Sequence, residues 1–311
     1  MLASILILVL AGLGPSPGAA DAVRSIVARV PGQVGVFAKN LSTGETIAIN
    51  ADQPFPTASV IKLAVLADAF QQIANGKLSL DARVRLTESD KVGIGDSGTL
   101  NELHDGTELT VADLLHLMIV VSDNTATNMV VERVGTASVN ALMERYGLKQ
   151  TKIFRPTFRD GRPDCCPELE KAFGLGMSTA REIGTLMEMI ATGRAVGASA
   201  SKQMLDILSR QQDRNMIARR IPFDAPGVLV ANKTGSDEEK VPDASGVRGH
   251  VRGDVAFIQA PNAKYVLAVF TRRVKDTSWT VDNAGVVAGA EISKVIWDAW
   301  TNKNSELRTK N

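Results

Sequence analysis

Cysteine and histidine are scarce in this chain. Its 311 residues include two cysteines, Cys165 and Cys166, and three histidines, His104, His116 and His250. Adjacent Cα atoms lie about 3.8 Å apart, closer than an ordinary disulfide requires, so the two cysteines predict no disulfide framework. The histidines are far apart in the sequence and lack metal-ligand spacing. We therefore predict no metal and no cofactor.

An excess of charge of one sign is also missing. The chain has 35 Lys and Arg and 34 Asp and Glu, a formal net charge of +1, without long runs of one sign. Such a surface does not gather nucleic acid or anionic membrane, so a small or neutral partner is expected. With 44% hydrophobic residues the chain can bury a large core in one domain or two lobes.

Long apolar runs are absent beyond the first residues. Met1 to Gly14 is apolar and is followed by Pro15-Ser-Pro-Gly-Ala-Ala20, which predicts a signal peptide over 1–20 with cleavage after Ala20. A basic start is lacking, so a misplaced start codon or a short anchor stays open, although a bilayer crossing needs about 20 residues. We expect a periplasmic or secreted protein of bacterial type, without stable membrane contact after cleavage.

Hydrophobic patterning predicts strands at both ends of the chain and helices between them. Runs 33–39 and 45–50 form a hairpin, and runs 228–233, 251–259 and 265–272 form three later strands. A buried helix is expected over 57–74, with others at 110–121, 124–133, 179–192 and 284–300. This order predicts an α/β lobe of 21–57 plus 206–302, an inserted all-helical lobe of 58–205, and a polar tail of 303–311.

Two short patterns match known motifs without their context. Gly93-Ile-Gly-Asp-Ser-Gly98 fits a dinucleotide glycine fingerprint and also the Gly-Asp-Ser-Gly of trypsin-like proteases. A charged segment precedes it where the fingerprint needs a strand, and no histidine lies upstream, so a surface loop is predicted. Ser199-Ala-Ser-Lys202 matches Ser-x-x-Lys by chance in a polar stretch.

Three other motifs gain meaning from occurring together. Ser59-Val-Ile-Lys62 places Ser and Lys on one helical face in an apolar segment, where the alternative is a snorkelling lysine. Ser122-Asp123-Asn124 joins two apolar helices and could be simple capping. Lys233-Thr234-Gly235 ends a predicted strand and could be an ordinary exposed strand end.

In this order the three motifs are the set of class A β-lactamases and penicillin-binding proteins. The chain resembles that superfamily of penicillin-recognising serine hydrolases over roughly 30–300, including Phe55-Pro56 and Thr110-Val-Ala-Asp-Leu114. The resemblance implies an α/β (α+β) fold, with an antiparallel five-stranded sheet flanked by terminal helices. With the inserted helical lobe these form a three-layer sandwich.

The resemblance also implies roles for the motif residues. Ser59 would attack the amide or lactam carbonyl, Lys62 would help to remove its proton, and Ser122 would relay a proton to the leaving nitrogen. Lys233 would hold Ser122 and the substrate carboxylate. Asn124 would orient Lys62 and the amide side chain of the substrate.

The same resemblance assigns the substrate-binding residues around Gly235. Backbone N–H groups of Ser59 and Ser236 would meet the oxyanion. Thr234 would bind the carboxylate of the ligand, and Arg252 is a looser candidate for the same anion.

One family motif is altered. Where class A β-lactamases have Glu-Pro-Glu-Leu-Asn, this chain has Cys166-Pro-Glu-Leu-Glu170, so a cysteine replaces the general base that hydrolyses the acyl-enzyme. Glu170 shares a helical face with Cys166 and could hold the hydrolytic water. The alternative is that Glu168 and Glu170 are solvated loop carboxylates. Cys166 has no evident cationic partner that would make it a thiolate base.

These observations favour an exported, monomeric serine hydrolase that opens β-lactams through an acyl-enzyme, with slow turnover. A D,D-peptidase acting on a peptidoglycan-like substrate, or a small esterase, would use the same nucleophile. A covalent sensor of β-lactams or cell-wall fragments that does not turn over is the third reading. A sensor would be expected to carry an attached partner domain, and none is recognised in the sequence.

Overall fold

A five-stranded antiparallel sheet forms the centre of the fold. The computed structural model describes residues 17–93, 98–157 and 163–301. Its central strands are β1 (Gln33–Asn40), β2 (Thr46–Ile49), β8 (Leu229–Glu238), β9 (His250–Ala260) and β10 (Ala263–Val274), in the order β2-β1-β10-β9-β8. β1 pairs with β10 along its whole length, from Gln33 opposite Arg272 to Asn40 opposite Tyr265. The sheet is therefore assembled from both chain ends, as predicted.

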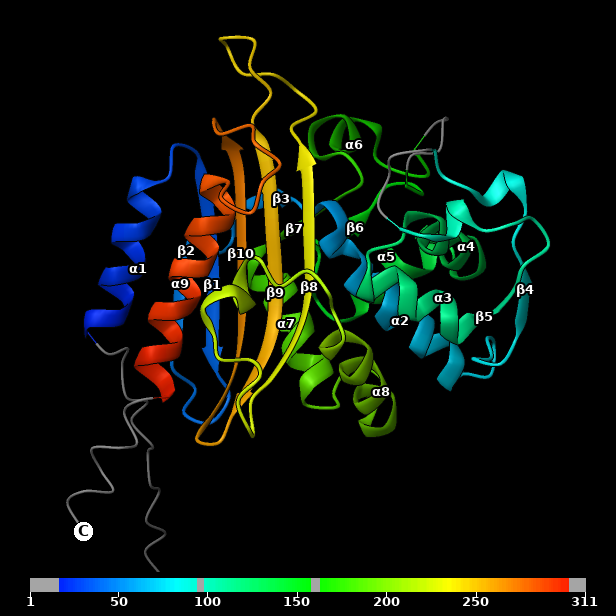
Figure 1. Cartoon of the computed structure of the whole chain (residues 1–311), viewed down its shortest axis with the longest axis horizontal. Helices are drawn as coiled ribbons and strands as arrows, with labels where there is room; N and C mark the ends of the chain where they lie inside the picture. The colour runs from blue at the N-terminus through cyan, green and yellow to red at the C-terminus, as the bar shows by residue number, and fades with distance from the viewer. Residues whose placement is uncertain (1–16, 94–97, 158–162, 302–311) are drawn as a thin grey trace, which may run out of the picture.

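The two terminal helices cover one face of this sheet. α1 (Pro17–Arg29) and α9 (Ala284–Thr301) lie side by side there (Figure 1). Val34, Val36 and Ala38, every second residue of β1, pack in one core with Val23 of α1 and Ile292 of α9. Because side chains alternate between the faces of a strand, this apolar spacing directs one face of β1 toward the terminal helices.

The opposite face carries α7 (Ala180–Ala191) and the inserted helical lobe. Phe37 and Phe270 point to this side and belong to the second core, together with Ile183 of α7. The other helices of the lobe are α2 (Lys62–Ala74), α3 (Val111–Val120), α4 (Asn124–Val134), α5 (Thr136–Arg145) and α8 (Ala198–Ser209). The resulting three layers confirm the predicted fold class (Figure 1).

Capping residues fix the junction between α3 and α4. α3 begins at a capping box in which Asp113 N donates to Thr110 Oγ1 at 3.1 Å and the Asp113 carboxylate accepts from Thr110 N at 2.8 Å. α4 begins after Asp123, whose carboxylate accepts from Ala126 N at 2.7 Å. Ser122, between the two helices, is thus held at a defined place in the chain.

The lobe predicted as all-helical also contains short strands, so that prediction needs correction. β4 (Arg83–Arg85) pairs with β5 (Glu108–Thr110), while β6 (Lys152–Ile153) and β3 (Pro54–Pro56) flank β7 (Gly176–Thr179). Strands of two to four residues are too short for an alternating pattern to be recognised. The predicted lobe boundary at 205/206 falls inside α8, whose Met204 and Leu208 belong to the same core as the helices of the lobe.

Short helices complete the described chain. They are η1 (Ala58–Ile61), η2 (Glu88–Asp90), η3 (Leu100–Glu102), α6 (Pro167–Phe173) and η4 (Ile217–Arg220). The helix predicted over 57–74 is therefore divided into η1 and α2, and every residue of α2 from Lys62 to Phe70 is buried. Burial of this helix agrees with the prediction.

Residues 1–16 of the predicted leader and the whole predicted tail, 303–311, lie outside the described residues. The last leader residues, Pro17 to Ala20, form the first turn of α1, where Ala19 and Ala20 are buried. Cleavage after Ala20 would remove that turn. In the ranges that the structure describes, no helix is both long and apolar enough to cross a membrane.

Candidate active site

Ser59 lies in η1, directly after the short strand β3. The end of β3 is fixed because Thr57 N donates to Gly176 O at 2.9 Å. Ala58, just before the serine, has a backbone φ of 44°, which residues other than glycine rarely adopt. Ser59 is partly exposed, whereas its neighbours Val60 and Ile61 are buried. The local fold therefore leaves Ser59 partly exposed between buried residues on both sides.

A pair of glycines lets this turn approach the sheet. Gly235 of β8 stands opposite Gly253 of β9. A Cβ on Gly235 would lie 2.7 Å from Thr57 O and 2.9 Å from Ser59 N. A Cβ on Gly253 would lie 2.6 Å from Phe270 Cδ1 and 3.2 Å from Val60 Cγ2. Only glycine leaves this space. The Gly of Lys-Thr-Gly is therefore required for packing against the backbone of Ser59.

Lys62 connects the Ser-x-x-Lys motif with Ser-Asp-Asn. It is the first residue of α2 and is fully buried. Its Nζ donates to Ser122 O at 2.7 Å, to Asn124 Oδ1 at 2.7 Å and to Ser122 Oγ at 3.1 Å. Hydrogen bonds to these acceptors make burial of the lysine amino group tolerable. The predicted contact between Asn124 and Lys62 is present, and Lys62 is not a snorkelling lysine.

Ser122 is the point at which two lysines meet. Its Oγ accepts from Lys62 Nζ and from Lys233 Nζ, each at 3.1 Å. A hydroxyl has two acceptor lone pairs and one proton, so with both lone pairs engaged its O–H remains the donor. The residue has a φ of 58°, a second strained non-glycine position in the site. This geometry suits a group that passes a proton to a ligand.

Lys233 reaches Ser122 from the sheet. It is fully buried on β8, and its Nζ also donates to Thr234 O at 2.6 Å. Burial disfavours the charged form and lowers the pKa of Lys233 to about 8. Lys233 therefore carries a positive charge at neutral pH and loses it in mildly alkaline solution.

Asp254 is a buried carboxyl beside this lysine that the motif analysis did not identify. It stands opposite Thr234 in the β8–β9 pairing. Its two oxygens accept from Asn232 Nδ2 at 3.0 Å and from Ile217 N at 2.9 Å. Burial raises the pKa of Asp254 to about 7, which the nearby Lys233 partly opposes.

Asp123 also has a role beyond capping α4. Its second carboxylate oxygen accepts from Thr99 N at 2.6 Å and from Leu100 N at 2.9 Å. Gly98, with a φ of 127°, lies so close that an added Cβ would stand 2.3 Å from this oxygen. Residues 94–97 of the predicted surface loop lie outside the described residues, but its last glycine thus packs beside Ser-Asp-Asn.

The substrate-binding residues predicted on β8 and β9 line a small cavity. It has a volume of about 100 Å³ and includes Thr234, Gly235, Ser236 and Arg252. Arg252 is 4% exposed, and its guanidinium donates to Val251 O at 2.8 Å and to Ser278 O at 2.9 Å. Thr234 is also buried, at 9% exposed, whereas Ser236 is exposed and is therefore more open to a ligand than Arg252.

The altered loop motif, Cys166 to Glu170, lies at the start of α6. Cys166 precedes α6 with a φ of 54°, and Pro167 is the first residue of that helix. Glu170 is partly buried, and its carboxylate accepts from Arg155 Nε at 2.8 Å. Glu168 is exposed, as expected for a solvated carboxylate. In the described part of the chain, Glu170 is thus engaged by Arg155, a residue of the same loop.

Side chains of the helical lobe hold this loop against α4 and α5. Asn128 pairs with Thr157 through two hydrogen bonds, of 2.7 Å from Thr157 N and 2.8 Å to Thr157 O. Thr136 Oγ1 donates to Asp164 at 2.6 Å.

Burial raises the pKa of Cys165 to about 11, and the neighbouring Cys166 adds to the shift. Cys165 is therefore a neutral thiol at physiological pH.

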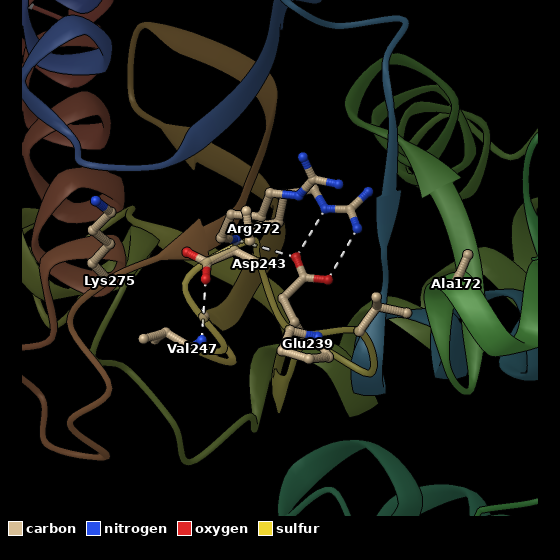
Figure 2. Close-up of a pocket in the computed structure, with 11 residues that line it drawn as sticks. Ala172, Glu239, Asp243, Val247, Arg272 and Lys275 are labelled. Carbon is tan, nitrogen blue, oxygen red and sulfur yellow. Dashed lines mark hydrogen bonds and ion pairs between the residues drawn. The ribbon is translucent and has the colours of Figure 1, made fainter.

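A larger cavity lies between α6 and the connection from β8 to β9. It encloses about 490 Å³ and is lined by Ala172, Val247 and Lys275 among others. Figure 2 shows the buried Glu239 accepting two hydrogen bonds from Arg272 on its wall, at 2.9 and 3.0 Å. None of the motif residues lines this cavity, so it is not the candidate active site.

The family model of the β-lactamase enzyme family matches residues 18–300. The chain belongs to this family. A β-lactamase from Sphaerobacter thermophilus is similar, with 31% identity, a TM-score of 0.76, and coverage of 92% of this chain and 98% of that chain. PBP-A is 25% identical with a TM-score of 0.76, covering 93% and 97%. A mutant of PBP-A, 25% identical with a TM-score of 0.75 and coverage of 93% and 98%, is an acyl-enzyme complex with penicillin G.

Within this β-lactamase family member, the structure brings Lys62, Ser122, Asn124 and Lys233 into one hydrogen-bonded group. Gly235 packs on the backbone of Ser59. In the part of the chain that the structure describes, no cluster of three or more His, Cys, Asp or Glu could hold a metal ion.

Sequence reasoning missed several residues around this group. Asp254 is the only acidic residue of β9 and directly precedes the apolar run Val255–Ile258, which is the one signal that could have drawn attention to it. Trp279, which also lines the small cavity, lies in a polar connection without a motif. The pairing of β8 with β9 brings Asp254 to the site, and the folding of the connection between β10 and α9 brings Trp279 there.

Proposed function

We propose that this chain is an exported, monomeric serine hydrolase that opens β-lactams through an acyl-enzyme on Ser59. The observation that carries the proposal is the convergence of Lys62 and Lys233 on the hydroxyl of Ser122. Both lone pairs of the Ser122 oxygen accept from lysine N–H groups, which leaves this hydroxyl with a proton to give, as expulsion of an amide nitrogen requires. Membership of the β-lactamase family supports the substrate class.

In the proposed acylation, Ser59 Oγ forms an ester bond with the lactam carbonyl carbon while the bond from that carbon to nitrogen breaks. Lys62, acting in its neutral amine form, accepts the serine proton, and Ser122 delivers a proton to the nitrogen. The Ser122 oxygen is then replenished from Lys62, so no net proton is lost. Water later adds hydroxide to the acyl carbon and returns a proton to Ser59.

Backbone and side-chain donors would stabilise the charges on the substrate. The N–H groups of Ser59 and Ser236 would meet the oxyanion, because Gly235 lets β8 approach η1. The buried charge of Lys233 and the hydroxyl of Thr234 would attract the carboxylate of the substrate. Arg252 would contribute through its charge, since its N–H groups already bind protein oxygens.

Slow deacylation is part of this proposal. Cys166 stands where the resemblance expects a general base, and Glu170 is occupied by Arg155. This observation favours a second candidate, a penicillin-binding protein that stays acylated. PBP-A, a relative of this chain, provides a precedent through its mutant acyl-enzyme with penicillin G. Peptide and ester substrates would be tested if β-lactams do not react.

The experiment is a time course of the purified protein with a chromogenic cephalosporin, followed in parallel by intact-protein mass spectrometry. Sustained turnover that is lost in Ser59→Ala supports a β-lactamase. One equivalent of product with a lasting adduct on Ser59 supports the second candidate. Absence of both would contradict the proposal. Analytical ultracentrifugation tests the monomer, and N-terminal sequencing of the exported protein tests cleavage after Ala20.

A further inference from the structure

A tryptophan stands exposed beside the substrate-binding strand. Trp279, in the connection between β10 and α9, is 60% exposed, the largest fraction among the large apolar side chains of the described residues. With Val281, which is 45% exposed, it lines the cavity that contains Thr234 and Ser236. A large aromatic surface in water next to a binding cavity is a candidate ligand contact.

The backbone around Trp279 is held by side-chain hydrogen bonds. The Asp276 carboxylate accepts from Ser278 N at 2.9 Å and from Ala284 N at 2.8 Å. Asn283, which is fully buried, donates to Asp276 O at 2.8 Å and to Ser278 O at 3.0 Å. These bonds fix the backbone at the start of the connection and at the start of α9, and so hold the segment that carries the Trp279 indole in place.

The indole also covers Arg252. The guanidinium carbon of Arg252 lies 4.7 Å from the Trp279 ring centre, and the His250 ring centre is 4.7 Å from it as well. Arg252 Nη2 is 2.8 Å from His250 Nδ1 and donates to Ser278 O. A ligand that approaches this side of the cavity therefore meets the surface of Trp279 before it meets the guanidinium.

We propose that Trp279 is a specificity-determining residue that stacks against a flat, conjugated group of the substrate. The inference rests on the proposed function and names a substrate class within it. In a cephalosporin, the ring carbon beside the one that bears the carboxylate carries the variable C3 substituent. With the carboxylate held at Lys233 and Thr234, a planar C3 substituent is the group expected to reach the indole. A penicillin has two methyl groups at the corresponding place.

The test compares two cephalosporins that share the thienylacetyl group at C7. One carries a planar dinitrostyryl group at C3 (nitrocefin), and the other carries an acetoxymethyl group (cephalothin). An aromatic stack accounts for about a 2- to 10-fold effect. Trp279→Ala should lower the acylation efficiency for the dinitrostyryl compound by that factor and lower it much less for the other. Trp279→Phe should preserve the ratio of the two efficiencies.

The ratio separates stacking from support of Arg252. An equal loss for both compounds in Trp279→Ala would mean that the indole acts only through Arg252, and no loss for either compound would equally overturn the proposal. Val281→Ala is the matched control, because it removes an exposed apolar side chain from the same cavity without removing an aromatic ring. This variant should leave the ratio unchanged.

Binding to Ser59→Ala protein separates this inference from the proposed function. Calorimetric titration of each cephalosporin into Ser59→Ala, with and without Trp279→Ala, requires no acylation. Tighter binding of the dinitrostyryl compound that disappears with Trp279→Ala would support the inference even if the wild-type protein forms no adduct. Equal binding of both compounds, or binding of neither, would overturn it.

Discussion

The ammonium of Lys233 donates a hydrogen bond of 3.1 Å to the hydroxyl of Ser122, which ties the sheet to the junction between α3 and α4. Lys62 donates to the same oxygen from the other side at 3.1 Å. Because burial lowers the pKa of Lys233 to about 8, one of these donors changes its charge within an accessible pH range.

Acylation should therefore decline in alkaline solution. Lys233 is protonated below its pKa and neutral above it, so the attraction for a substrate carboxylate is lost as the pH rises through about 8. We expect the second-order rate constant for acylation to fall there by up to about tenfold per pH unit. Stopped-flow measurements between about pH 6 and 10 check this. Lys233→Arg should react more slowly but show no such decline, because a guanidinium stays charged.

Gly235→Ala should impair the site more than the stability of the chain. A Cβ there would stand 2.7 to 2.9 Å from backbone atoms of Thr57, Ser59 and Val60, so η1 must move. A displacement near 1 Å costs about 100-fold in rate, and overpacking costs about 1–3 kcal/mol in the free energy of unfolding. Acylation kinetics and urea unfolding measure both. Gly93→Ala, where a Cβ meets nothing within 4 Å, is the control. Normal acylation by Gly235→Ala would contradict the role given to this glycine.

Asp254 should make the protein less stable as the pH rises. Its pKa is about 7 in the folded chain, against 3.8 for an unperturbed carboxyl, so the folded state binds the extra proton. Stability is then complete below about pH 4 and is lost through about pH 7. Unfolding free energies of Asp254→Asn should lack this part of the pH dependence. Asp52→Asn at an exposed ion pair should keep it, and a parallel slope in Asp254→Asn would refute the assignment.

Much of the fold could be predicted because its main elements have a clear periodicity. The hairpin of β1 and β2, the capping box at Thr110 and the apolar helix α2 each carry a local signal, and each is found. The strands β4 to β7 could not be predicted, since two to four residues show no alternation. Their existence depends on pairing with segments far away in the chain.

The candidate site could be predicted as far as its motifs extend. Ser-x-x-Lys, Ser-Asp-Asn and Lys-Thr-Gly identify Lys62, Ser122 and Lys233, which the structure joins by hydrogen bonds. Asp254 and Trp279 reach the site only through the register of β8 with β9 and the folding of the connection before α9. No short-range pattern contains that information, so a sequence alone could not supply it.

Glu170→Gln tests whether this carboxylate assists the hydrolytic water. If it does, acylation should stay intact and deacylation should slow by about 100-fold or more, since a general base contributes that much. The rate of adduct decay, followed by intact-protein mass spectrometry, measures the step. Because Glu170 is paired with Arg155, loss of the pair alone could disturb the loop. Arg155→Gln is therefore the control, and equal slowing in both variants would assign Glu170 a structural role.

Cys166→Glu should accelerate deacylation if the loop is aligned correctly with the family motif. A glutamate at this position would supply the general base that Cys166 cannot, and such a base is worth about 100- to 10,000-fold in rate. Cys166→Gln is the matched control, because it has the same shape and the same left-handed backbone, with a φ of 54° at this position, but no basic group. Acylation rates should be similar in both variants, and adduct lifetimes should be shorter only in the glutamate variant. If Cys166→Glu leaves the adduct lifetime unchanged while its fold and acylation are normal, the residue beside α6 does not face the acyl-enzyme, and the slow step must be attributed to another part of the site.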